Sequence, residues 1–446
     1  MGYTDKYLDC LEASAVIARW CEQTGKRPAL GYTSNLDVVV EWDEEEWGRL
    51  LEEYLKGPPS FTEGEVISCM EDLARVVCFF ALNGLGGEVE VDNADVVAEI
   101  KRRFGFRYGL GGTCAQGAAA LGAIGVPVLI HITDTSEEVV NFLACEGAET
   151  VKNGERVPIN SVQSNMPALV HLIMQFTKSG KLCVQGKNIA VPLSNRVIID
   201  YDQVHKRLPV ERSFMAYLEE HAEMICSYDI SGFNAILDMA VLAERVDELS
   251  GHYKRLKDKN PNLFIYLESA HYFSSAARDY VYGALADYID IMGMNEEELV
   301  DFAEKSGILV EKDDIGTVIT CLDHMLQAFP VRGFVLHTKD YSMYYGQEPG
   351  QVNIELGLTM GNLMSGTRAR TGRYGTYEDC RETLELSLSE TGLRFYEELQ
   401  NRRLKYHAVL VPSRYMERPK YTIGLGDTFV AGMQLGFLGI NFFTLS

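Results

Sequence analysis

Residues 236–269, ILDMAVLAERVDELSGHYKRLKDKNPNLFIYLES, combine a helix with a following strand, which is the repeating unit of a parallel sheet. Across residues 236–260, leucine and valine recur at three- and four-residue spacing, a pattern that predicts an amphipathic helix. The apolar run FIYLES at 264–269 then predicts a buried strand. This unit favours an α/β fold in which helices cover a mostly parallel sheet.

The same alternation continues through most of the chain, where further strands and helices are predicted. The predicted strands are 28–40, 126–132, 289–294, 333–338 and 407–413, and further helices are 44–55 and one that starts at Ser274. Residues 155–205 differ, because strand-like alternation is interrupted by turn signals at 179–181 and 185–188. We therefore expect a doubly wound, mostly parallel α/β core with a smaller strand-rich element that covers it.

Composition narrows the class of protein. The chain has 446 residues and a formal charge of −23, which disfavours binding to nucleic acid or to anionic membrane surfaces. No secretory signal is visible, and ten scattered cysteines fit reduced thiols in the cytoplasm. Two uncharged stretches, 108–133 and 428–446, contain glycines, so we interpret them as interior segments rather than membrane spans.

The segment PKYTIGLGDTFVAGMQLGF at 419–437 contains the strongest chemical signal. A strand-like stretch leads into Gly424, Leu425, Gly426 and Asp427, and an uncharged helical run follows. Glycines let backbone amides approach a ligand, and the amino end of a helix favours an anion. Asp427 is placed to accept a proton from an attacking hydroxyl while the amides hold phosphoryl oxygens. A plain glycine turn with an aspartate cap explains the motif equally well.

Polar side chains also follow several predicted strands. Asn35 and Asp37 lie in GYTSNLDVVVEW, and His337 and Thr338 end the strand at 333–338. Carboxylates follow the strands at 264–269 and 289–294. Because ligands of open parallel sheets bind beyond the carboxyl ends of the strands, we expect these groups to converge.

Taken together, the motifs resemble those of the ADP-dependent glucokinases and phosphofructokinases, a family of ribokinase-like sugar kinases. The resemblance covers nearly the whole chain in matching order. It is carried by GYTSNLD, GGTCAQG (111–117), SNRVI (194–198), YLES (266–269), GMNEEEL (293–299), VLHTKDY (335–341) and TIGLGDTF (422–429).

The resemblance implies a magnesium-dependent transfer of the β-phosphoryl group of ADP to a sugar hydroxyl. Asp427 is implied as the base and the amides of residues 424–426 as the anion hole. Asn295 and Glu298 match an Asn-x-x-Glu motif that holds magnesium through water, and Glu268 matches the carboxylate of a His-x-Glu motif. Tyr266 replaces the histidine of that motif, which leaves the role of its first position open. As an alternative, residues 295–298 form an acidic helix start.

For the nucleotide, the resemblance implies contacts from Arg196 and Asn195 and from His337 and Thr338. Arg196 matches the arginine that reaches from the lid to the ADP phosphates, where a permanently charged guanidinium binds oxygens bidentately. A solvated structural arginine and a histidine that caps its strand are the alternatives.

For the acceptor, the candidates are named by the same resemblance. They are Asn35, Asp37, Glu88, Gly112, Thr113 and Gln116. Glu88 matches a lid glutamate linked to glucose recognition, although Glu90 could occupy that position. A sugar phosphate would also need basic residues, for which Lys181, Lys187 and Arg370 are available. Glucose and fructose 6-phosphate remain open.

These implications define the expected molecule. The core comprises residues 1–37, 109–154 and 207–446, and a discontinuous lid comprises 38–108 and 155–206. The expected partners are ADP and a sugar or sugar phosphate, and the expected state is a cytoplasmic monomer or small homo-oligomer. An ATP-dependent ribokinase-like carbohydrate kinase and a non-catalytic sugar- or nucleotide-binding regulator are the alternatives.

Overall fold

Two sheets of different size organise the computed structural model, which describes residues 3–62, 64–272 and 274–438. The large sheet has ten strands, in the order β18 (His407–Pro412), β17 (Tyr341–Gly346), β16 (Gly333–His337), β15 (Ile291–Asn295), β14 (Phe264–Glu268), β13 (Ile225–Ile230), β1 (Arg27–Gly31), β6 (Val128–Ile130), β7 (Ala148–Lys152) and β8 (Glu155–Pro158). The strands from β16 to β7 pair in parallel, and antiparallel strands close both edges. The predicted doubly wound, mostly parallel sheet is confirmed.

Helices cover both faces of the large sheet. One face packs against α7 (Arg212–Glu220), α8 (Met239–Lys259), α9 (Ser275–Leu285), α10 (Glu296–Lys305), α11 (Ile315–Ala328) and α14 (Glu390–Gln400). The other packs against α1 (Tyr3–Thr24), α5 (Thr113–Ala123), α6 (Glu137–Leu143), α12 (Ile354–Thr371), α13 (Tyr377–Thr383) and α15 (Leu425–Gly436). The predicted cap of α9 is present, because the Ser274 side chain accepts a hydrogen bond from the Ala277 amide at 3.4 Å.

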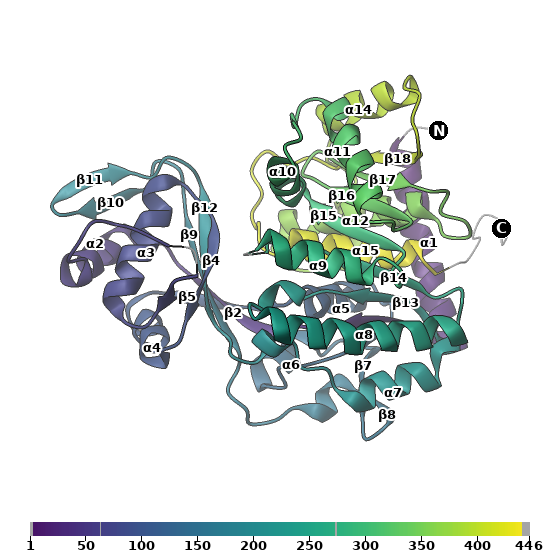
Figure 1. Ribbon diagram of the computed structural model, residues 1–446, viewed down its shortest axis with the longest axis horizontal. Helices are drawn as coiled ribbons and strands as arrows, with labels where there is room; N and C mark the ends of the chain where they lie inside the picture. Colours follow the sequence, from purple (N-terminus) through teal and green to yellow (C-terminus); the bar gives the residue numbers. More distant parts are fainter. Residues whose placement is uncertain (1–2, 63, 273, 439–446) are drawn as a thin grey trace.

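The small sheet forms a second domain to the side of the large one (Figure 1). Its strands follow the order β3 (Val66–Ile67), β4 (Gly87–Val91), β12 (Asn195–Tyr201), β9 (Val170–Phe176), β2 (Asn35–Val40) and β5 (Phe106–Gly111). A separate hairpin joins β10 (Lys181–Val184) to β11 (Lys187–Ala190), as the turn signals predicted. Helices α2 (Glu44–Tyr54), α3 (Met70–Asn83) and α4 (Ala94–Arg103) belong to this domain. Short 3-10 helices complete the chain at η1 (Ile159–Val162), η2 (His205–Arg207), η3 (Ala222–Met224) and η4 (Phe233–Ala235).

The two faces of the small sheet differ. One face is apolar, and Val38, Leu172 and Val197 on it pack with the residues of α2, α3 and α4. The alternate residues point to the other face, where Val39, Ile173 and Ile198 meet Tyr421 and Ile423 from the large domain. Since successive side chains of a strand alternate between faces, this second face is the one turned toward the large domain.

The structure corrects one predicted strand. Residues 28–40 form two strands rather than one, because β1 joins the large sheet and β2 joins the small sheet. The chain crosses between the domains at residues 32–34. The predicted lid ranges remain a prediction, although β8, within 155–206, pairs with β7 in the large sheet.

Across the described parts of the chain, no helix combines the length and apolar character needed to span a membrane. The predicted interior stretch 108–133 supplies β5, α5 and β6. Of the second stretch, 428–446, residues 439–446 lie outside the described residues.

Candidate functional site

The glycine turn before α15 brings Asp427 to the carboxyl edge of the large sheet. Gly424 caps the helix with a left-handed φ of 67°, and Asp427 lies in the first turn. The Nε2 atom of Gln116 donates to Oδ2 of Asp427 at 2.6 Å. Asp427 is partly exposed, so this carboxylate is not enclosed in a dry interior. The predicted turn at the amino end of a helix is therefore present, and Asp427 within it is a partly exposed residue.

Several charges act on Asp427. Burial raises the pKa of this carboxyl, whereas the hydroxyl of Thr113 lowers it. Glu268 raises the pKa further, and the cationic Arg368 and His337 lower it. A carboxylate held between opposing influences of this kind suits proton acceptance, because its charged form is neither trapped in an ion pair nor fully solvated.

Glu268, at the end of β14, binds two neighbouring side chains. Oε1 of Glu268 lies 2.8 Å from Nε2 of His337, and the hydroxyl of Tyr266 donates to Oε2 at 2.7 Å. The His337 ring also stacks on Phe429 of α15 at 4.8 Å between centroids. Burial alone would lower the pKa of His337, but the carboxylate of Glu268 raises it above its usual value. His337 thus joins the Glu268 carboxylate to α15, and its nucleotide contact stays a prediction.

Asn295 and Glu298 form a capping box at the start of α10. The Asn295 side chain accepts from the amides of Glu297 and Glu298, and the Glu298 carboxylate accepts from the Asn295 amide at 3.0 Å. Burial, followed by the charge of Glu268, raises the pKa of Glu298 to about 7. The predicted acidic helix start is therefore present, and it also sets Glu298 close to the carboxylate of β14.

The side chains of Thr338 and Asn195 both form hydrogen bonds within the protein. The Thr338 hydroxyl donates to the carbonyl of Tyr341 at 2.9 Å, within the β16–β17 turn. Asn195 donates to the carbonyl of Gly84 at 3.2 Å and accepts from the Arg196 amide at 2.9 Å. The predicted nucleotide contacts of both residues stay predictions.

Arg196 lies on β12, on the face of the small sheet turned toward the large domain. Burial raises the pKa of Tyr421, and the charge of Arg196 is near enough to oppose that rise. This guanidinium is partly exposed beside the segment that leads into the glycine turn. Arg196 thus lies on the small domain beside the segment that precedes Asp427, and its contact with phosphate stays a prediction.

Five of the six predicted sugar-binding residues lie where β2, β5 and α5 meet, whereas Glu88 lies on β4. Nδ2 of Asn35 donates to Oδ1 of Asp37 at 2.9 Å, and both side chains are buried. Gly112 caps α5 at φ 86°, and a Cβ at this position would lie 2.5 Å from the carbonyl oxygen of Thr33. The close approach of this backbone to the domain crossing requires glycine.

A row of titratable side chains crosses the inner face of the small sheet. Asp37 pairs in register with His171, and His171 pairs with Asp200. Glu88 lies on the neighbouring β4, and the charge of Asp200 acts on it. We call Asp37, Glu88, His171 and Asp200 the sugar-side cluster, after the predicted sugar contacts of Asp37 and Glu88. His171 and Asp200 were missed from the sequence, although strand alternation in VHLIMQF and NRVIIDY places both on the face opposite the apolar residues.

Burial and neighbouring charges shift the pKa values of Asp37, Glu88 and His171 in the sugar-side cluster. Burial, chiefly, raises the pKa of Asp37 to about 6 and that of Glu88 to about 7. Burial alone would lower the pKa of His171, but the charges of Asp200 and Asp202 raise it well above 6.5. Nε2 of His171 lies 3.2 Å from Oδ1 of Asp200 and 3.3 Å from Oδ2 of Asp202. Perturbed groups of this kind in a cleft are typical of a functional site.

The basic residues considered for a sugar phosphate lie elsewhere. Lys181 and Lys187 are exposed on the β10–β11 hairpin, at the end of the small domain far from the large one (Figure 1). Arg370 donates to Thr383 and to the carbonyl of Asp379, between α12 and α13. The structure brings none of the three to the sugar-side cluster.

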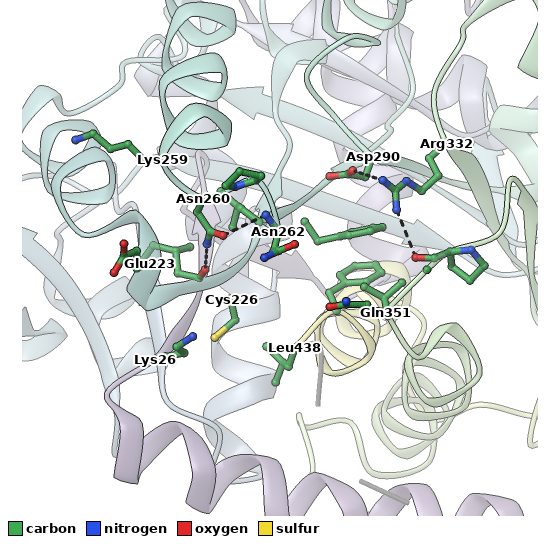
Figure 2. A pocket seen from close by; sticks show the side chains of 18 of the residues that line it. Lys26, Glu223, Cys226, Lys259, Asn260, Asn262, Asp290, Arg332, Gln351 and Leu438 are labelled. Carbon is green, nitrogen blue, oxygen red and sulfur yellow. Dashed lines mark hydrogen bonds and ion pairs between the residues drawn. The ribbon is translucent and has the colours of Figure 1, made fainter. Parts of the chain in front are cut away.

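Two cavities lie at opposite ends of the large sheet. A cavity of about 200 Å³ separates Glu88 on the small domain from Asn234 and Tyr272 on the large one. A larger cavity, of about 1000 Å³, opens where β13 and β14 begin, and Figure 2 shows Asp290 and Arg332 at its wall. Because open parallel sheets bind ligands beyond the carboxyl ends of their strands, the smaller interdomain cavity lies at the end of the sheet where a ligand is expected, and Glu88 of the sugar-side cluster lines it.

Known proteins share both the sequence pattern and the fold. Residues 26–435 match the sequence model described as the ADP-specific Phosphofructokinase/Glucokinase conserved region. An ADP-dependent glucose/glucosamine kinase from Pyrococcus abyssi is 24% identical over 427 residues, covering 90% of this chain and 91% of the relative. An ADP-specific phosphofructokinase from Pyrococcus furiosus is 25% identical over 452 residues, covering 92% and 96%.

Solved structures support the fold independently of close sequence similarity. The last common ancestor of ADP-dependent phosphofructokinases from Methanosarcinales has a TM-score of 0.77 at 19% identity, covering 98% of this chain and 99% of its own. An ADP-dependent kinase in complex with fructose-6-phosphate and ADPβS has a TM-score of 0.77 at 18% identity, with the same coverage. The likeness therefore extends over both domains.

Proposed function

Because this chain belongs to the ADP-specific phosphofructokinase/glucokinase family, we propose that it transfers the β-phosphoryl group of ADP to a sugar hydroxyl and releases AMP. The observation that carries the proposal is the partly exposed Asp427 at the amino end of α15, beside the carboxylates that follow β14 and β15. ATP-dependent transfer and pure binding are less well supported, since the family match covers residues 26–435 and the acidic groups of a kinase are present.

Asp427 acts as the base in the proposed reaction. It takes the proton of the sugar hydroxyl as the hydroxyl oxygen forms a bond to the β-phosphorus of ADP. The bond between that phosphorus and the bridging oxygen breaks, and AMP leaves with the electron pair. The amides of Gly424, Leu425 and Gly426, at the positive end of the helix dipole, stabilise the phosphoryl oxygens.

Magnesium is the proposed metal, and the chemistry of the donors fits it. Glu268 and Glu298 supply hard carboxylate oxygens at the ends of adjacent parallel strands, and Asn295 supplies an amide. Their oxygens already accept hydrogen bonds within the protein, so they suit a magnesium ion that retains its water. Bound there, the ion would offset the repulsion between these carboxylates and the diphosphate.

The small domain is the proposed lid. Its inner face already contacts the large domain through Tyr421 and Ile423, directly before the glycine turn. Closure would carry Arg196 toward the phosphates and exclude water, which protects the activated phosphoryl group from hydrolysis. Asn195, His337 and Thr338 complete the proposed nucleotide side.

The acceptor is a neutral hexose in this proposal, in preference to fructose 6-phosphate. Asp37, Glu88 and Asp200 supply three carboxylates to the sugar-side cluster, and His171 supplies one cation among them. Carboxylates accept hydrogen bonds from sugar hydroxyls, whereas they repel a phosphate. The relative from Pyrococcus abyssi is a glucose/glucosamine kinase, which agrees with such an acceptor.

An activity that consumes ADP and a hexose suits the cytoplasm, and a monomer or small homo-oligomer is the proposed state.

The activity is tested by AMP release from Mg-ADP with glucose, glucosamine, fructose 6-phosphate and other hexoses. ATP replaces ADP in a parallel series. We expect ADP-dependent turnover that is fastest with a neutral hexose or its amino derivative. Sugar binding without AMP release would support the regulator instead, and faster turnover with ATP would support the ATP-dependent alternative.

A further inference from the structure

Arg368, on α12, is a buried cation next to the proposed base. Its side chain is 3% exposed, and no carboxylate among the described residues lies within ion-pair distance of it. Nε donates to the carbonyl of Ile423 and Nη2 donates to Oε1 of Gln116, each at 3.0 Å. The rings of Tyr374 and Tyr421 have centroids 4.0 and 4.9 Å from the guanidinium carbon. Because burying a charge is costly, a cation held in this way points to a role beyond packing.

The Gln116 amide connects this cation to the base. Its Oε1 atom accepts from Nη2 of Arg368 at 3.0 Å and from the hydroxyl of Tyr374 at 3.3 Å. Its Nε2 atom donates to Oδ2 of Asp427 at 2.6 Å. The reversed amide would turn its oxygen toward the carboxylate and its N–H groups toward the guanidinium, so both contacts would be repulsive. Arg368 and Tyr374 therefore select the one orientation in which Gln116 donates to Asp427.

We propose that Arg368 is a positioning residue for phosphoryl transfer, which acts through the Gln116 amide to hold the Asp427 carboxylate in line with the sugar hydroxyl. This inference rests on the proposed role of Asp427 as the base. It assigns the Gln116 side chain to the base, whereas the sequence pointed to a sugar contact.

The Asp427 carboxylate can still accept a proton while Gln116 donates to it. Each carboxylate oxygen can accept two hydrogen bonds, so the contacts with Gln116 and Thr113 leave lone pairs for the proton of the sugar hydroxyl. A rotation that moves the accepting oxygen by about 1 Å can cost on the order of 100-fold in rate. The Gln116 amide restricts that rotation.

The glycine turn provides independent support. A Cβ atom on Gly424 would lie 1.9 Å from Oε1 of Gln116, so the amide occupies the space that any side chain at 424 would need. Glycine at position 424 therefore allows two features. It adopts the left-handed conformation of the helix cap, and it leaves space for the Gln116 amide that orients the base.

Steady-state kinetics with three variants test the proposal. Gln116→Leu removes the amide at similar volume, Arg368→Met removes the guanidinium, and Tyr374→Phe removes the weaker donor. Since a hydrogen bond to a charged group contributes about 1.5–3 kcal/mol, we expect kcat to fall roughly 10- to 100-fold in the first two and less in the third. KM for ADP and for the sugar should change by less than about twofold, as expected for an interaction that does not touch the substrate.

A double-variant cycle identifies the route of the effect. At a pH well above the pKa of Asp427, where the direct effect of the Arg368 charge on that pKa no longer changes its ionisation, Gln116→Leu/Arg368→Met should be no slower than Gln116→Leu alone, because Arg368 acts through the amide. Arg368→Lys retains a charged donor and should recover part of the lost kcat. Arg370→Met, on the same helix but bonded to Thr383 and Asp379, is the matched control and should keep the original kcat.

The measurements distinguish a failure of the positioning role of Arg368 from a failure of Asp427 as the base. Additive losses, or a raised KM with unchanged kcat, would overturn the positioning role. Asp427→Asn is measured in parallel: if it is inactive while Gln116→Leu and Tyr374→Phe turn over normally, only the positioning role fails. Turnover by Asp427→Asn would remove the proposed base itself. If Arg368→Met does not fold, the other two variants still decide the question.

Discussion

Replacing Glu88 with glutamine should stabilise the protein while weakening sugar binding. Burial, with Asp200 adding to it, raises the Glu88 pKa from 4.5 to about 7. At about 1.36 kcal/mol per pKa unit, this rise corresponds to about 3 kcal/mol against the ionised form above pH 7. Because the side chain is partly exposed, solvent screening reduces the expected gain to about 1–2 kcal/mol.

The gain depends on pH in a defined direction. Between pH 4.5 and 7 the folded protein holds a proton on Glu88 that the unfolded chain has released, so the free energy of unfolding falls as pH rises through this window. In Glu88→Gln the side chain at this position does not ionise, so the free energy of unfolding does not fall in this way. The variant should therefore exceed the original protein by the full amount at pH 8 and by much less at pH 5.

Urea unfolding followed by tryptophan fluorescence measures the change in the free energy of unfolding, and the signal comes largely from the small domain that contains Glu88. Two of the three tryptophans, Trp42 and Trp47, stack within the small domain at 5.2 Å between centroids. Glu90→Gln, on the same strand as Glu88, is the matched control, because it removes the ion pair between Glu90 and Lys206 and should lower stability slightly at both pH values. An equal stability difference for Glu88→Gln at pH 5 and pH 8 would refute the assignment of a raised pKa to Glu88.

Three further expectations concern the site. Asp427→Asn should abolish AMP release while calorimetry shows ADP binding largely retained; near-normal turnover would exclude Asp427 as the base. Glu298→Gln should need more magnesium for half-maximal rate, and an unchanged magnesium titration would count against a metal role. KM for the sugar should rise as pH falls from 8 to 5, because Asp37 and Glu88, with pKa values of about 6 and 7, lose the charge that accepts sugar hydroxyls. A flat pH profile of that KM would argue against their contact with sugar.

Local patterns predicted the fold well. The helix–strand unit at 236–269 appears as α8 and β14, and the serine cap of α9 is in place. The strand at 28–40 was wrong as a single element, because continuous apolar character does not show that a chain leaves one sheet for another. That crossing depends on partners far away, β13 for β1 and β5 for β2.

The site was predictable only where one segment carries it. Asp427 and its turn are contiguous in sequence, and so are Asn295 and Glu298. Arg368 was missed because its partner Gln116 is 252 residues away, and no local motif records such a contact. His171 was missed for a related reason: its neighbours in the sugar-side cluster, Asp37 and Asp200, are brought next to it by strand register.

Asp427 stands between two acidic groups that divide the site. On one side, Glu268 raises the Asp427 pKa; on the other, Asp427 itself contributes to the raised pKa of Asp37 in the sugar-side cluster. A diphosphate is repelled by both groups, so in the proposed reaction it binds beside Glu268 and Glu298, where the amino end of α15 and the proposed magnesium ion would compensate the repulsion. A neutral sugar meets no such repulsion and fits the other side. In the proposed reaction, the distribution of charge thus directs the two substrates to opposite sides of the carboxylate that accepts the proton of the sugar hydroxyl.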